Sequence, residues 1–162
     1  MQPHLQQRGE QPYVAIQRRV TTAQISRELP PLADQVAEWL KQHGQQPSGA
    51  PFFRYFLTDM AGEGQFEVAV GFPVAVPLTG SGDVVAGSFP AGTYAVLSFI
   101  GPYDRLTEAH GLLQKWCADQ GIRLRQDGEH TWGAMIESYE TDEMAQPDSS
   151  KWQTDIFYLI EQ

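Results

Sequence analysis

The sequence predicts an α+β domain that consists of two consecutive strand–helix–strand–strand units. Short segments with alternating apolar residues are typical of half-buried strands, and two other segments carry apolar residues at helical spacing. Along the chain these segments follow the order strand, helix, strand, strand, and the same order then repeats. We expect a tandem duplication, with halves at about 12–78 and 90–162, packed about a pseudo-two-fold axis around a central ligand groove.

The first unit is expected to follow a disordered or frayed N-terminal segment, residues 1–11, which is polar and rich in glutamine. In the predicted helix Leu32, Val36 and Leu40 recur at every fourth position, and Gly44 is placed to end it. The expected elements are a strand at 12–20, a helix at 29–43, and strands at 52–59 and 65–77.

A segment rich in glycine and serine, residues 79–92, is expected to connect the first unit to the second. The second unit contains the clearest helix of the chain, with its apolar stripe at Leu106, Ala109, Leu113 and Trp116. The expected elements are a strand at 93–100, a helix at 101–121, and strands at 131–141 and 151–160.

The 162-residue chain has 41% hydrophobic and 19% charged residues, as is typical of an ordered globular protein, and we expect one domain over residues 12–162. The formal net charge of −9 argues against a nucleic-acid partner, because phosphate binding needs a basic surface. The sequence shows neither a secretory leader nor a stretch of about 18 apolar residues, so we expect no membrane partner and a cytoplasmic location.

We also expect no metal and no cofactor. Cys117 is the single cysteine, and the four histidines are scattered without a metal-binding spacing. His110 and Cys117 lie two helical turns apart, roughly 10 Å, which is too far for a direct catalytic pair. Glycine-rich phosphate-binding motifs and the GxSxG motif of serine hydrolases are absent.

Glu137 is the residue that most needs an explanation, because it lies in a strand whose two faces both look buried. Alternation places Met135, Glu137 and Tyr139 on one face and Ala134 and Ile136 on the other. We expect the Ala134 face to pack against a helix and the Glu137 face to line the groove. A buried carboxylate without a partner costs several kcal/mol, so Glu137 either pairs with a base such as Arg54 or has a function.

Aromatic residues on neighbouring strands would surround this carboxylate. Phe53 and Tyr55 share one face of their strand, and Trp152 shares a face with Tyr158. A carboxylate among aromatic rings suits a lipophilic cation, which gains cation–π attraction and charge neutralisation. With a tyrosine as proton donor, the same carboxylate could act as a general base or nucleophile. Ordinary core packing is the alternative for each of the rings.

The chain resembles the GyrI-like small-molecule-binding family, also described as AraC-type effector-binding domains. The resemblance runs from Tyr13 to Ile160. It is carried by PFFRYF at 51–56, FPAGTYAVLSFIGPYDRL at 89–106, WGAMIESY at 132–139 and KWQTDIFYLI at 151–160. It implies the duplicated fold described above and a central groove that binds hydrophobic, often cationic, compounds.

The resemblance also implies site residues. Glu137 matches the acidic residue that recognises charge in drug-binding members, and Tyr55, Tyr139, Phe53 and Trp152 match the aromatic walls. Met135 lies on the same strand face and completes the expected ligand-binding set.

Three functions follow from the resemblance. The first is a stand-alone binding protein that senses or sequesters hydrophobic small molecules, cationic ones included, since a helix-turn-helix domain does not fit before Tyr13. The second is a hydrolase of cyclopropane-bearing xenobiotics, with Glu137 and Tyr139 as the catalytic pair. The third is a protein module that modulates DNA gyrase. The first two need the same carboxylate, so the sequence leaves binding and catalysis open, along with the ligand and the oligomeric state.

Overall fold

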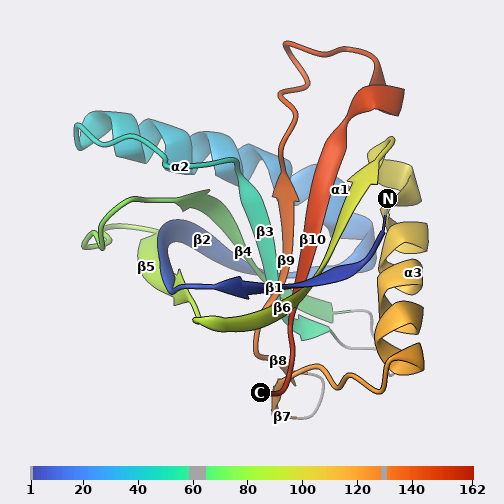
Figure 1. The fold of residues 1–162 in the computed structure, drawn as a ribbon. Helices are drawn as coiled ribbons and strands as arrows, with labels where there is room; N and C mark the ends of the chain where they lie inside the picture. Colours follow the sequence, from blue (N-terminus) through green and yellow to red (C-terminus); the bar gives the residue numbers. More distant parts are fainter. Residues whose placement is uncertain (1, 59–64, 129–130) are drawn as a thin grey trace.

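A large antiparallel sheet occupies the centre of the fold, and the long helices lie against it (Figure 1). The structure is a computed structural model that describes residues 2–58, 65–128 and 131–162. The strands are β1 His4–Arg8, β2 Gln11–Thr21, β3 Phe52–Thr58, β4 Gln65–Pro73, β5 Val84–Phe89, β6 Gly92–Ile100, β7 Gln126–Gly128, β8 Thr131–Trp132, β9 Met135–Tyr139 and β10 Gln153–Leu159. The helices are α1 Thr22–Glu28, α2 Pro30–Gln42 and α3 Leu106–Asp119, with 3-10 turns η1 Tyr103–Arg105 and η2 Ser149–Lys151.

The strand order is β1-β6-β10-β9-β3-β4-β2-β5, and off this path β8 pairs with β3 and β7 pairs with β8. The first predicted unit supplies β2, β4 and β3, and the second supplies β6, β10 and β9. The two units meet where β3 pairs with β9, at the register Phe53 to Glu137. The α+β class is therefore confirmed, whereas the internal duplication stays a prediction.

The two strands at the ends of this order correct the expectations for the segments that contain them. His4–Arg8 pairs with β6 instead of fraying, and Val84–Phe89 pairs with β2 inside the expected connector. The side chains of β1 are almost all exposed, so its polar sequence shows no apolar alternation. Backbone hydrogen bonds hold β1 against β6, and these bonds do not depend on apolar side chains.

The helices begin and end where local sequence allows. Pro30 and Pro31 occupy the first turn of α2, where a missing N–H costs nothing. Gly44 and Gly121 follow α2 and α3 in the left-handed conformation, at φ 66° and 70°, as expected for helix stops. The expected helix at 101–121 is shorter than predicted, because residues 103–105 form η1 and α3 begins at Leu106. No helix in the described ranges is long and apolar enough to span a membrane.

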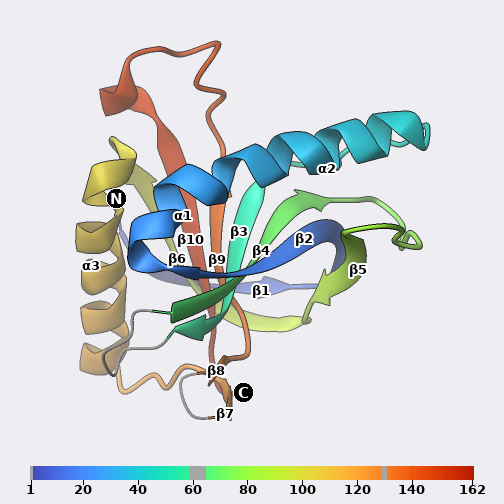
Figure 2. The same ribbon diagram turned by 180° about the vertical axis from the view of Figure 1, so that it is seen from behind.

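Both long helices cover the same face of the sheet (Figure 2). Leu32, Val36 and Leu40 of α2 pack on valines of β2 and β4. Leu106, Ala109, Leu113 and Cys117 of α3 pack on β6, β9 and β10, through residues that include Leu97, Met135 and Ile156. Tyr55 and Tyr139 contact both of these clusters and therefore lie between the helices.

The opposite face of the sheet has a core of its own, which contains Tyr13, Phe52 and Tyr94 and, in the described residues, no helical residue. Ala134 and Ile136 belong to this core, so the expectation that their face packs against a helix was wrong. The reason is curvature. β1 and β2 are consecutive in the chain yet lie near opposite ends of the strand order, so the sheet must curl until its ends approach (Figure 1). The curled sheet covers its own concave face, which leaves the Glu137 face to the helices.

Candidate functional site

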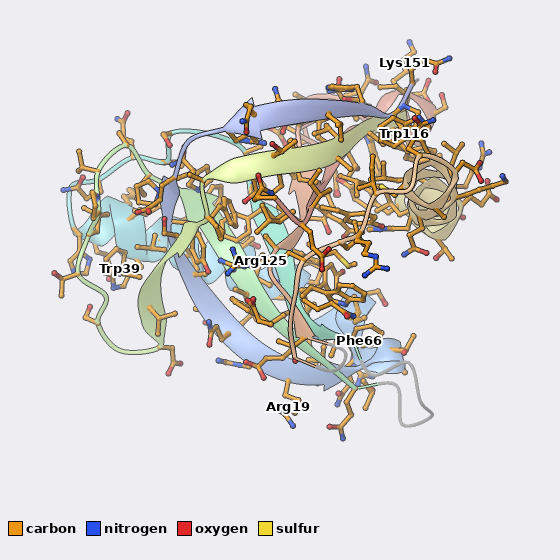
Figure 3. All side chains as sticks on the ribbon, turned by 60° about the horizontal axis from the view of Figure 1, so that its bottom comes forward. Arg19, Trp39, Phe66, Trp116, Arg125 and Lys151 are labelled. Atoms are coloured by element: carbon orange, nitrogen blue, oxygen red, sulfur yellow. The ribbon has the colours of Figure 1, made fainter. Side chains whose placement is uncertain are left out.

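Glu137 lies at the centre of the sheet, on the face that carries the helices. Its cross-strand neighbours are Phe53 on β3 and Ile156 on β10. The residue is 5% exposed. Viewed from below (Figure 3), side chains fill the space between α2, which carries Trp39, and α3, which carries Trp116. The low exposure of Glu137 shows that neighbouring side chains enclose its carboxylate.

Three side chains from three elements hydrogen-bond to this carboxylate. The Tyr139 hydroxyl donates to Oε1 at 2.5 Å, and the Tyr55 hydroxyl donates to the same oxygen at 3.2 Å. On the other side, Nε2 of His110 lies 2.6 Å from Oε2. The second ring nitrogen of His110, Nδ1, contacts the hydroxyl of Tyr158 on β10. A buried carboxylate needs such partners, and here β3, β9 and α3 supply them.

These contacts decide the charge of Glu137. Burial works to raise its pKa, but the hydrogen bond and charge of His110, together with the tyrosine hydrogen bonds, hold the pKa below its ordinary value of 4.5. Burial, followed by the nearby Glu137 charge, raises the pKa of Tyr55 and of Tyr139 well above 10.0. At neutral pH the site therefore combines a carboxylate anion with two neutral phenols that donate to it.

A row of aromatic rings leads from Glu137 toward the surface. Phe53 meets Tyr139 edge-on with 4.9 Å between ring centroids, and Tyr139 meets Tyr103 of η1 at 5.4 Å. Tyr103 packs on Trp152 at 4.7 Å. The indole N–H of Trp152 donates to the carbonyl of Gln146 in the loop before β10. Tyr103 and Trp152 are both half-buried, so the row reaches solvent at this end.

The structure brings most of the predicted site residues together. Tyr55 and Tyr139 bind the carboxylate, Phe53 packs on Tyr139, and Met135 is buried against α3 two residues from Glu137. Trp152 joins this group through Tyr103 rather than by touching the carboxylate.

Sequence reasoning missed His110, which it weighed only as a metal ligand or as a partner of Cys117. The signal was present in the helix pattern. His110 follows Leu106 by four residues and precedes Leu113 by three, so it lies on the buried stripe of α3. A histidine on that stripe must meet a partner in the sheet. Tyr103 and Tyr158 were also missed as parts of the site.

The ion pair between Glu137 and Arg54 that the sequence left open is absent, because Arg54 points to the other face of the sheet. Adjacent strand residues face opposite ways, and it is Phe53 that pairs with Glu137. Arg54 is nevertheless buried. It donates to the Tyr13 hydroxyl at 3.2 Å, to the Ser88 carbonyl at 2.9 Å and to the Gly133 carbonyl at 3.0 Å.

A separate hollow of about 900 Å³ opens beside β1, β6 and β10, and its lining is mostly polar. Arg8, Glu140 and Asp155 contribute charged groups to it, and none of the predicted site residues lines it. We place the candidate site at Glu137 rather than here, because the buried charge and its partners lie at Glu137. Among the described residues, no group of three or more His, Cys, Asp or Glu side chains could hold a metal ion.

Comparison with known proteins identifies the fold and the family. Over 99% of its length the chain is similar to EcmrR in a DNA complex, with a TM-score of 0.76 and 22% identity, and it spans 57% of that longer chain. It also matches the isolated EcmrR C-terminal domain, with a TM-score of 0.72, 21% identity, and coverage of 99% of this chain and 98% of that domain.

Two further solved structures share the fold at lower identity. SAV2435 bound to tetraphenylphosphonium matches with a TM-score of 0.69 and 12% identity, over 99% of this chain and 94% of SAV2435. A hydrolase from Listeria innocua matches with a TM-score of 0.66 and 10% identity, over 98% of this chain and 91% of the hydrolase. No curated protein matches the chain in sequence. The profile of the GyrI-like small molecule binding domain matches residues 1–161, and the chain therefore belongs to the GyrI-like family.

Proposed function

We propose that this GyrI-like domain binds hydrophobic organic cations at Glu137, between α2 and α3. One observation carries the proposal: a carboxylate that is 5% exposed is held in its charged form among aromatic rings. A flat or bulky organic cation would meet both a counter-charge and ring faces there, and each attracts it. The site would serve to sense or sequester such compounds.

The ring row supplies the route by which a ligand reaches the carboxylate. Tyr103 and Trp152 are half-buried and belong to η1 and to the segment before β10, at the surface end of the row. A ligand would displace these rings and stack in their place against Tyr139. The solved structure of SAV2435 with tetraphenylphosphonium supports this proposal by likeness of fold.

The test is a calorimetric titration with two probes of similar size, cationic tetraphenylphosphonium and neutral triphenylphosphine oxide. Glu137→Gln should weaken cation binding by about 2–5 kcal/mol, roughly 30-fold or more, and should change binding of the neutral probe little. Glu108→Gln on the exposed surface of α3 is the matched control, since it removes the same formal charge. A folded Glu137→Gln protein that binds tetraphenylphosphonium as wild type does would refute the proposal.

A hydrolase is the second candidate, and the contact between Tyr139 and Glu137 favours it. The 2.5 Å hydrogen bond joins a carboxylate to a proton donor, as hydrolysis of a strained ring would require. Glu137 would either activate water to attack a ring carbon or attack that carbon itself, while the C–C bond opens and Tyr139 protonates the other carbon of that bond. After direct attack, water would hydrolyse the resulting ester, which releases the product and restores Glu137. Mass spectrometry should then detect more product than protein when a cyclopropane-bearing substrate is in excess, and Tyr139→Phe should slow turnover. Product that never exceeds the amount of protein would count against catalysis on that substrate.

A further inference from the structure

His110 contacts the oxygen of the Glu137 carboxylate that the two tyrosines do not reach. Its Nε2 lies 2.6 Å from Oε2, and the two side chains are 19% and 7% exposed. The other donors to Glu137, Tyr55 and Tyr139, are neutral phenols that reach Oε1. Of these three partners, the imidazole of His110 is the one that can take up a proton and become a cation.

Among the described residues around His110, Glu137 is the charged group in direct contact with its ring. β9 presents Glu137, and β10 presents the hydroxyl of Tyr158. β6 contributes apolar residues, and η1 contributes Tyr103, whose hydroxyl interacts with the Glu143 carboxylate. Cys117 of α3 belongs to the same cluster, and burial raises its pKa, which keeps it neutral. On α3 itself, the charged residues Glu108 and Lys115 are exposed and pair with Arg105 and Asp119. Arg54 lies on the far face of the sheet.

We propose that His110 is a built-in, protonatable counter-cation of this site, so that binding of an organic cation expels a proton from the imidazole ring. The inference rests on the proposed function of Glu137 as the cation receptor. An imidazolium and a ligand cation beside one carboxylate would repel each other. A like charge nearby favours the neutral form of a titratable group, here the imidazole ring. The carboxylate then keeps one positive partner in both states: the imidazolium without ligand, and the organic cation with it.

The hydrogen bonds of His110 allow it to lose a proton and still keep its contact with Glu137. The imidazolium carries N–H groups at both ring nitrogens, and loss of one proton to solvent leaves a neutral ring with a single N–H. The Tyr158 hydroxyl beside Nδ1 can either accept from that nitrogen or donate to it. When Nδ1 is the nitrogen that loses its proton, Tyr158 donates to it, and Nε2–H still donates to Glu137.

Cation affinity should therefore increase with pH. While His110 is protonated in the free protein, one proton released per cation bound makes affinity rise by up to about tenfold per pH unit. Binding of a neutral ligand should show no such slope, because it brings no charge to the carboxylate. Tetraphenylphosphonium suits this test, since it has no proton of its own to lose.

The experiment is calorimetric titration of tetraphenylphosphonium from about pH 5 to 8, the range in which histidine side chains ordinarily change charge. Buffer pairs that differ in ionisation enthalpy, acetate and MES at the acidic end and phosphate and Tris at the neutral end, report the number of protons released. Wild type should release up to one proton per cation at the acidic end. His110→Gln should release none and bind the cation more tightly than wild type there. His43→Gln is the matched control, because His43 is exposed and stacks on Trp39.

Three outcomes would overturn the inference, and they separate it from the proposed function. Tight cation binding with no pH slope in wild type would contradict the inference and leave the cation site intact. Proton release that persists in His110→Gln would assign the proton to another group. Absence of cation binding at every pH would remove the proposed function and this inference with it.

Discussion

Nε2 of His110 on α3 lies 2.6 Å from Oε2 of Glu137 on β9. This contact joins α3 to β9, which pairs with β3 from the first half of the chain. Tyr55 from the first unit reaches the other oxygen of the same carboxylate. One buried charge therefore links both halves of the domain, and stability and ligand binding should both depend on it.

Acid should destabilise the protein through Glu137. The pKa of Glu137 is lowered in the folded state, so its contribution to stability is present above its ordinary value of 4.5 and is lost as pH falls through the folded value. Urea unfolding between pH 3 and 7 should show this loss in wild type and in Glu108→Gln, and a smaller loss in Glu137→Gln. Equal pH slopes in all three proteins would contradict the assignment.

The tyrosine donors should differ in their contribution to stability. Tyr139→Phe removes a 2.5 Å hydrogen bond to a charged group and should cost about 1.5–3 kcal/mol. Tyr55→Phe removes a 3.2 Å bond to the same oxygen and should cost less. Each substitution keeps the ring, so packing is preserved. Urea midpoints for both variants at pH 7 measure the difference, and the reverse order would show that the Tyr139 bond is weaker than its length indicates.

Adjacent leucines on α3 provide a test of the packing. Leu113 is fully buried in the cluster beneath α3, so Leu113→Ala should cost about 2–5 kcal/mol of unfolding free energy. Leu112 is 47% exposed, and Leu112→Ala should change stability by less than about 0.5 kcal/mol. The same deletion at neighbouring positions controls for helix propensity. Similar losses at both positions would mean that α3 packs through a different face.

Arg54 should matter for stability on the face opposite Glu137. Arg54→Met leaves the Ser88 and Gly133 carbonyls without their buried donor, which should cost about 1–3 kcal/mol. Arg18→Met is the control. Arg18 is exposed, and its pair with the exposed Asp83 carboxylate, at 3.7 Å, is a surface ion pair that should contribute little to stability. Thermal or urea unfolding measures both variants. A stable Arg54→Met protein would show that the methionine restores by packing what the lost hydrogen bonds had contributed.

Local pattern predicted the strands and helices whose apolar residues face a core. Leu32, Val36 and Leu40 gave α2, and the stripe at Leu106, Ala109 and Leu113 gave α3, because burial imposes that spacing. β1 showed no such pattern, since HLQQR pairs with β6 through its backbone and leaves almost all of its side chains exposed. Edge strands of this kind carry no apolar signal for sequence reasoning to detect.

Only part of the site was predicted, because patterns along single strands and helices do not show how these elements pack together. Alternation placed Met135, Glu137 and Tyr139 on one face, and they do share it. Which face the helices cover depends on how the sheet curls, and alternation along a strand holds no information on curvature. His110 comes from a distant helix, so only the register of α3 against β9 brings it to Glu137.

A crystal structure of the protein with tetraphenylphosphonium tests the central claim most directly. The account predicts the phosphonium between α2 and α3, with its phenyl rings against Tyr139 and its charge within about 6 Å of the Glu137 carboxylate and the tyrosine rings. A cation bound instead in the polar hollow beside β1, β6 and β10, near Glu140 and Asp155, would contradict it.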